Sequence, residues 1–292
     1  MPKAALAVIL LLNALPPFAK SKPVSIPFVI SSDMVVVPAT VNGTIPIHVI
    51  LDTGAGLDIL APSLIEKLHG KPAGQFSGFR MTGERLDIAL FVIPELAVGP
   101  IDKKNQMVGS FDALDQLHID GIVSLNDFRQ NPFTLDFISQ VIVFETSKSL
   151  AERLAKGKFS PLQLDDQRGI ALDVFAQFLI AGQPGQCEID TGSQNATVSL
   201  RYMALIGIEK DAKNVQKQEK RTIAGGMEVR YKTQLPEISL AALPEIGLAH
   251  PGVSFSNIIY DCVVGTDFWA GKALTIDIAG RRLIVSNPPQ TH

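Results

Sequence analysis

Two copies of the tripeptide Asp-Thr-Gly, at residues 52–54 and 190–192, carry the strongest chemical signal in this sequence. Each copy directly follows an apolar run, so each Asp is expected in a turn at the end of a strand. A single copy would predict only an acidic turn. Two carboxyl groups held about 3 Å apart, however, share one proton, and such a pair can deprotonate a water molecule and protonate a carbonyl oxygen. The chemistry open to these residues is hydrolysis of a peptide bond.

The sequence that surrounds each tripeptide is also repeated. After each Asp comes an apolar run near a glycine that ends in Asp-Phe, at residues 119–128 and again at 262–268. A pair of apolar segments then follows in both halves, at residues 134–144 and 275–285. Features in the same order in both halves indicate an internal duplication. Two copies predict two lobes related by a pseudo-twofold axis, with Asp52 and Asp190 face to face.

The paired Asp-Thr-Gly-Ala and Asp-Thr-Gly-Ser turns resemble those of the aspartic proteases, and the likeness covers residues 24–288. It implies an all-β, two-lobed acid-protease fold of the pepsin and retropepsin type, with β-barrel lobes and a few short helices. The sequence is more similar to a fused, duplicated retroviral-type lobe than to pepsin, because residues 74–86 lack a Tyr and the first lobe lacks Cys. An aspartic endopeptidase is the implied activity. A non-catalytic peptide-binding module on the same fold is the alternative, since a fold alone does not establish activity.

The resemblance also implies roles for the residues of the two turns. Asp52 and Asp190 would be the catalytic pair. The two Thr hydroxyls would hydrogen-bond across the lobe interface, and the two glycines would permit a sharp turn whose N–H groups point at the carboxylates. Ser193 could donate to Asp190, whereas Ala55 cannot do so for Asp52. The residues expected to support the pair are Thr53, Gly54, Thr191, Gly192 and Ser193.

Glycine-rich segments at residues 74–90 and 222–235 occupy equivalent places in the repeat. The resemblance implies that they are hairpin flaps that close over an extended polypeptide substrate, which would add main-chain pairing to them. The apolar residues Phe76, Phe79, Ile223 and Val123 suggest a preference for hydrophobic side chains. The residues assigned to substrate binding by the flaps are Phe76, Gly78, Phe79, Gly83, Ile223, Gly225 and Gly226.

Five further Asp residues recur in the repeat and alternate with apolar residues. This pattern favours turn ends and solvent-facing strand positions rather than catalysis. The five residues are Asp58, Asp127, Asp136, Asp267 and Asp277. The His residues are scattered without ligand spacing, so we expect no metal and no other cofactor.

Two cysteines, Cys187 and Cys262, lie three residues before Asp190 and Gly265. If their strands lie side by side, as the resemblance implies, a disulfide between them is conceivable. Buried free thiols are the alternative, because Cys is often a core residue. A catalytic Cys is not expected, since no His or Asn signature accompanies either one.

Residues 1–22 combine Lys3 with an uncharged apolar run, which is typical of a secretory signal peptide or an N-terminal anchor. We therefore expect an exported protein, periplasmic or secreted, that is membrane-tethered only if this segment is retained. The expected order is a first lobe at 23–147, a linker helix at 148–160, a second lobe at 161–288 and a tail at 289–292. A net charge of −3 argues against a nucleic-acid partner. We expect a monomer that acts on polypeptides.

Overall fold

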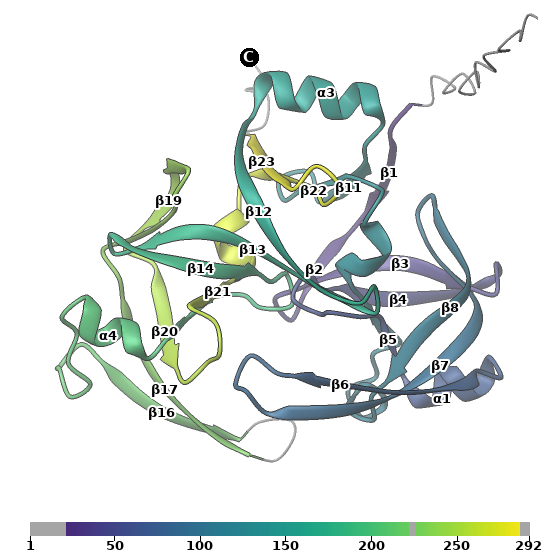
Figure 1. Cartoon of the computed structure of the whole chain (residues 1–292), viewed down its shortest axis with the longest axis horizontal. Helices are drawn as coiled ribbons and strands as arrows, with labels where there is room; N and C mark the ends of the chain where they lie inside the picture. The colour runs from purple at the N-terminus through teal and green to yellow at the C-terminus, as the bar shows by residue number, and fades with distance from the viewer. Residues whose placement is uncertain (1–21, 222–225, 287–292) are drawn as a thin grey trace, which may run out of the picture.

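The computed structural model describes residues 22–221 and 226–286, which form two β lobes joined by a shared sheet (Figure 1). The predicted signal or anchor lies almost entirely outside the described residues, as does the predicted tail at 289–292. Within the described part of the chain, no helix has the length and apolar character needed to cross a bilayer. The prediction of an all-β, two-lobed fold with few short helices is confirmed.

The first lobe is an eight-stranded sheet in the order β2-β3-β4-β9-β5-β8-β7-β6, and an additional pairing of β3 with β7 curls it back on itself. The β3–β4 hairpin turns at Asn42 and Gly43, which both have positive φ, as a tight hairpin turn requires. The strands are β2 (Val29–Ser31), β3 (Met34–Val41), β4 (Ile45–Leu51), β5 (Ile59–Leu60), β6 (Lys71–Phe79), β7 (Arg85–Val98), β8 (Ile101–Ser110) and β9 (Gly121–Val123). The helices are α1 (Pro62–Lys67), α2 (Ala113–Leu117) and the 3-10 helix η1 (Leu125–Phe128).

The second lobe repeats this plan with its own hairpins and short helices (Figure 1). The abundance of Lys, Gln and Glu in residues 208–221 predicts a solvated loop or helix face, and this prediction is wrong for residues 216–221. These residues form a strand, because their backbone pairs with β17 while the side chains of 216–219 and 221 face solvent. The elements are β13 (Ala171–Ile180), β14 (Gln183–Ile189), β15 (Ala196–Ser199), α4 (Arg201–Leu205), β16 (Gln216–Arg221), β17 (Met227–Gln234), β18 (Glu237–Leu240), β19 (Leu243–Ala249), β20 (Gly252–Ser256), β21 (Cys262–Val264) and α5 (Thr266–Trp269).

Six strands from both lobes form one sheet on the side of the molecule away from the β6–β7 hairpin (Figure 1). Its centre is the antiparallel pair of β10 from the first lobe and β22 from the second, where the hydroxyl oxygens of Thr134 and Thr275 lie 2.6 Å apart. The same sheet continues through β12 and β13 into the second lobe, so the lobes are joined by continuous backbone hydrogen bonding. Its strands are β1 (Val24–Pro27), β10 (Phe133–Asp136), β11 (Val141–Phe144), β12 (Lys158–Gln167), β22 (Ala273–Asp277) and β23 (Arg282–Ser286).

Helix α3 (Ser147–Lys156) connects the lobes and packs beside β23, above the shared sheet in Figure 1. Its start is fixed by a capping box, in which Thr146 and Ser149 each hydrogen-bond the backbone N–H of the other. The helix ends at Gly157. It overlaps the predicted linker helix at 148–160 and begins one residue earlier.

Candidate active site

Each Asp-Thr-Gly turn is held by the same pair of parallel strands in its lobe. In the first lobe β4 pairs with β9, and the backbone N–H of Asp52 donates to Val123 O at 3.0 Å. In the second lobe β14 pairs with β21, and the N–H of Asp190 donates to Val264 O at 3.0 Å. The duplication therefore delivers both Asp residues to equivalent positions.

The threonines of the two turns lock the lobes to each other. The hydroxyl of Thr53 donates to Ile189 O at 2.6 Å, and that of Thr191 donates to Leu51 O at 2.5 Å. Each hydroxyl also accepts the backbone N–H of the other threonine, at 3.0 and 3.1 Å. Both side chains are fully buried. Four hydrogen bonds between the lobes thus fix the two turns as one unit.

The glycines bring each turn against the opposite carboxyl group. Their N–H groups donate to the Asp of their own turn, Gly54 to Asp52 at 2.9 Å and Gly192 to Asp190 at 2.8 Å. Their φ angles are not positive, so a sharp turn is not what requires glycine here. A Cβ added at Gly192 would lie 2.5 Å from Asp52 Oδ2, and one at Gly54 would lie 2.7 Å from Asp190 Cγ. Glycine is needed because the carboxyl of the other lobe occupies that space.

Asp52 and Asp190 lie close enough for their carboxyl groups to hydrogen-bond, which requires a proton between them. Burial, followed by the charge of Asp190 and that hydrogen bond, raises the pKa of Asp52 well above its usual value. Hydrogen bonds from the N–H groups of Gly54 and Ala55 lower it in part. The predicted bond from Ser193 Oγ to Asp190 is not among the hydrogen bonds of the described residues, although Ser193 lines the same cleft as Asp190.

Comparison with known proteins agrees with this geometry. Residues 37–126 match the family model described as aspartyl protease. The fold is similar to that of basic 7S globulin from soybean, with a TM-score of 0.52 and 11% identity over 91% of this chain and 95% of that one. It is also similar to that of edgp, with a TM-score of 0.53 and 11% identity over 91% and 94% of the two chains. No curated protein sequence matches the chain.

Residues 37–126 of the chain are similar to the aspartyl protease family, and the chain shares the fold of the two solved structures. Its family-model match spans the first Asp-Thr-Gly turn, and the structure supplies the second turn in the same setting. At 11% identity the likeness to the two solved structures shows the fold and not the activity. Catalysis therefore has to be argued from the residues of this chain.

A cleft of about 330 Å³ contains both Asp side chains, as expected of the superfamily fold. The β6–β7 hairpin borders it and contributes Phe76, Gly78 and Phe79. The tip of this hairpin reaches the second lobe, where Met81 O accepts the backbone N–H of Ile259 at 2.8 Å. The first predicted flap therefore bridges the two lobes.

The other predicted flap residues do not line this cleft. Gly83, with φ of +78°, and Gly226 border a neighbouring hollow between the β6–β7 and β16–β17 hairpins. Ile223 and Gly225 lie outside the described residues. The assignment of Val123 to the cleft wall is wrong, because its side chain is fully buried in the core.

Three of the five acids predicted to face solvent are buried, which corrects that prediction. Asp58 and Asp127 are bridged by Gln106, whose Nε2 donates to both at 2.8 and 2.9 Å. Asp58 also accepts from the N–H and hydroxyl of Ser124, and burial and the charge of Asp127 raise its pKa well above the usual value. Asp277 is buried against Arg282, whereas Asp136 is half-buried and Asp267 is exposed.

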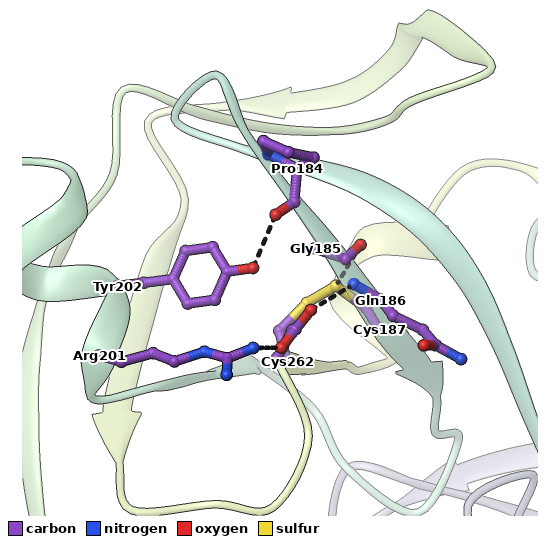
Figure 2. The surroundings of a disulfide bond; sticks show 8 residues. Pro184, Gly185, Gln186, Cys187, Arg201, Tyr202 and Cys262 are labelled. Carbon is purple, nitrogen blue, oxygen red and sulfur yellow. Dashed lines mark hydrogen bonds and ion pairs between the residues drawn. A yellow bond between two sulfur atoms is a disulfide. The ribbon is translucent and has the colours of Figure 1, made fainter.

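The two cysteines form a disulfide between directly paired residues of β14 and β21, so the structure has bridged cysteines rather than free thiols (Figure 2). Their Cα atoms are 4.5 Å apart. Nearby, Tyr202 OH donates to Pro184 O at 2.7 Å, and Asp261 accepts the N–H of Gln186 at 2.8 Å. The disulfide ties β14, the strand that leads to Asp190, to β21, and the bond from Tyr202 ties β14 to α4.

Three cleft residues of the second lobe were missed by the sequence prediction: Asp173, Glu188 and Tyr260. Glu188 could have been found from the duplication. It lies two residues before Asp190, where the first lobe has Ile50 two residues before Asp52. Within the described residues no group of three or more His, Cys, Asp or Glu side chains is arranged to hold a metal ion.

Proposed function

We propose that this protein is an aspartic endopeptidase that hydrolyses peptide bonds with a water molecule activated between Asp52 and Asp190. The observation that carries the proposal is that both carboxyl groups line one cleft, each against the glycine of the opposite turn, with the turns held by four hydrogen bonds between the lobes. Both turns are intact, which is what catalysis by this pair needs.

In the first step the ionised carboxylate of Asp190 takes a proton from water, and the water oxygen attacks the peptide carbonyl carbon. The protonated carboxyl of Asp52 gives its proton to the carbonyl oxygen, which forms a tetrahedral diol. In the second step Asp190 protonates the leaving nitrogen, the C–N bond breaks, and a diol hydroxyl returns its proton to Asp52. The raised pKa of Asp52 supports the sharing of one proton within the pair.

The substrate would lie extended across the cleft beneath the β6–β7 hairpin. The first lobe supplies an apolar wall on its side of the cleft, which supports acceptance of a hydrophobic side chain there. Members of this wall are Leu57, Ile59, Phe76, Leu86, Ile88, Phe111 and Ile122. Export from the cytoplasm is part of the proposal, supported by the apolar start of the sequence and by the disulfide, which oxidising compartments favour.

The test compares the wild-type protein with Asp52→Asn and Asp190→Asn in cleavage of an unfolded protein substrate between acidic and neutral pH. Both variants should lose cleavage, by about 10³-fold or more since each removes one of the two proton-transfer groups. Asp112→Asn, at an exposed position without a side-chain capping bond, is the matched control and should retain full cleavage. Cleavage that survives in Asp52→Asn would remove that residue from the mechanism.

The second candidate is a non-catalytic peptide-binding module. The observation in its favour is that the fold is shared by solved proteins at only 11% identity, so the fold itself carries no activity. Binding of a transition-state-mimicking peptide without cleavage of any substrate, at any pH, would establish this alternative.

A further inference from the structure

The two halves of the cleft differ in chemistry although the lobes are duplicates. The first lobe lines it with apolar side chains, whereas the second lobe contributes Gln167, Asp173, Glu188 and Tyr260. Strand pairing locates the origin of the difference. Glu188 pairs with Phe175, and its first-lobe counterpart Ile50 pairs with Val36. Asp173 lies two residues before Phe175, as Met34 lies two residues before Val36. Asp173 therefore corresponds to Met34 in the first lobe. Two apolar residues of one lobe are thus acids in the other.

Both acids are nearly inaccessible, with 4% of Glu188 and 9% of Asp173 exposed. The Oε1 atom of Glu188 has no hydrogen-bond partner among the described residues. Asp173 Oδ2 accepts only a long bond, from Gln167 Nε2 at 3.4 Å. A buried carboxyl oxygen without a partner is costly. The pair is therefore incomplete without a donor that enters from the cleft.

Asp173 also lies against the first active-site turn. Leu172 N–H donates to Gly56 O at 2.8 Å, and Asp173 Oδ1 would lie 3.1 Å from a Cβ at Gly56. Glu188 lies near the end of β14, two residues before Asp190, and both residues line the cleft. The two acids are therefore next to the catalytic pair and not at a remote end of the cleft.

The charges that act on these two side chains are all negative. Burial, then Asp190, Asp173 and Asp52, raise the pKa of Glu188 well above its usual value. Burial and the charge of Asp165 raise the pKa of Asp173 to about 6. Tyr260 shares this field, since burial, then Glu188 and Asp173, raise the pKa of its hydroxyl. Among the described residues that line the cleft, the one cation is Arg80 on the β6–β7 tip, which pairs with Glu84 at 3.9 Å.

We propose that Glu188 and Asp173 form a subsite beside Asp190 that binds the basic side chain of a substrate Lys or Arg. A cation supplies the missing donors to Glu188 Oε1 and relieves the repulsion between the neighbouring acids. The apolar first-lobe wall then takes a hydrophobic side chain on the other side of the scissile bond. This inference rests on the proposed endopeptidase activity and specifies its substrate.

The test uses two peptides that differ only at one residue next to the scissile bond, Lys in one and the uncharged norleucine in the other. This pair of peptides is made twice, once with the varied residue on the amino side of the scissile bond and once with it on the carboxyl side. On one of these sides, wild-type protein should cleave the Lys peptide with a higher kcat/KM than the norleucine peptide. Glu188→Gln should reduce kcat/KM for that Lys peptide by roughly 30-fold or more, as expected when one partner of a buried charge pair is removed, and should leave the norleucine peptide within about twofold.

Asp173→Asn should act in the same direction. The matched control is Asp165→Asn, which removes the same charge from the exposed residue paired with Asp173 and should preserve the preference. Equal wild-type rates on Lys and norleucine peptides would overturn the subsite and leave the endopeptidase standing. An equal loss on both peptides in Glu188→Gln would also overturn it, because Glu188 would then act on the catalytic pair.

A binding measurement keeps the two proposals separable. Non-cleavable hydroxyethylene versions of the same peptides are titrated into the wild-type protein and Glu188→Gln by calorimetry. The subsite predicts tighter binding of the Lys version to wild-type protein, and loss of that difference in the variant. If no peptide is cleaved but this difference appears, the endopeptidase proposal fails and the subsite stands. If the difference is absent, the subsite fails whatever the activity.

Discussion

The two buried threonines are predicted to hold the lobes together, and Thr191→Val tests this directly. The substitution keeps the shape of the side chain and removes the hydroxyl. It leaves Leu51 O without its donor and the N–H of Thr53 without its acceptor. A buried polar group without a partner costs about 1–3 kcal/mol, so the free energy of unfolding should fall by roughly 2–6 kcal/mol.

Thr53→Val should cost a similar amount, because its hydroxyl accounts for the other two of the four bonds. Unfolding in urea can be followed by fluorescence of Trp269, the only tryptophan and a fully buried one. Thr197→Val is the matched control. This threonine is also buried, but its hydroxyl makes no hydrogen bond within the described residues. A loss for Thr191→Val within about 0.5 kcal/mol of the control would refute the reasoning, since that is the usual range for substitutions without a structural role.

Two further predictions concern stability. Reduction of the disulfide, or the double substitution Cys187→Ala with Cys262→Ala, should lower the free energy of unfolding by up to about 4 kcal/mol, because the bridged residues are 75 positions apart. Urea unfolding with and without reductant measures this loss. Equal free energies of unfolding in the two conditions would contradict the prediction. The pKa of Asp173 is about 6 in the folded protein against an ordinary value of 3.8, so the folded protein binds this proton more tightly than the unfolded chain does. The free energy of unfolding should therefore fall as pH rises from about 4 to above 6. Asp173→Asn should flatten this decline by about 2–3 kcal/mol, and an unchanged slope would show that Asp173 is not the group responsible.

The duplication made the main features of the fold predictable from the sequence. Two Asp-Thr-Gly turns in matched surroundings required matched strands, and both Asp residues lie where those strands end. The sequence left both a disulfide and free thiols possible for the two cysteines, because spacing alone does not set strand register. Only the pairing of Cys187 opposite Cys262 brings the two sulfur atoms together.

Contacts between elements far apart in the sequence were not predictable in the same way. Alternation of apolar and polar residues shows which residues share a face, but not whether another element covers that face. Asp58 and Asp127 looked solvent-facing, yet Gln106 from β8 covers and bridges them. Glu188 was not predicted, because the first half has Ile50 at the equivalent position and the repeat therefore does not mark it. The functional difference lies where the halves diverge.

The pairing of β10 with β22 constrains how a polypeptide gains entry. Since both lobes belong to one hydrogen-bonded sheet, the floor of the cleft cannot swing apart at the lobe boundary. The roof is different, because the contact of Met81 with Ile259 is a single backbone hydrogen bond worth about 1 kcal/mol. A ligand therefore has to enter beneath the β6–β7 hairpin once this bond is broken. Under the proposed endopeptidase function, such an entrance would admit an unfolded strand or a loose loop and exclude a folded domain.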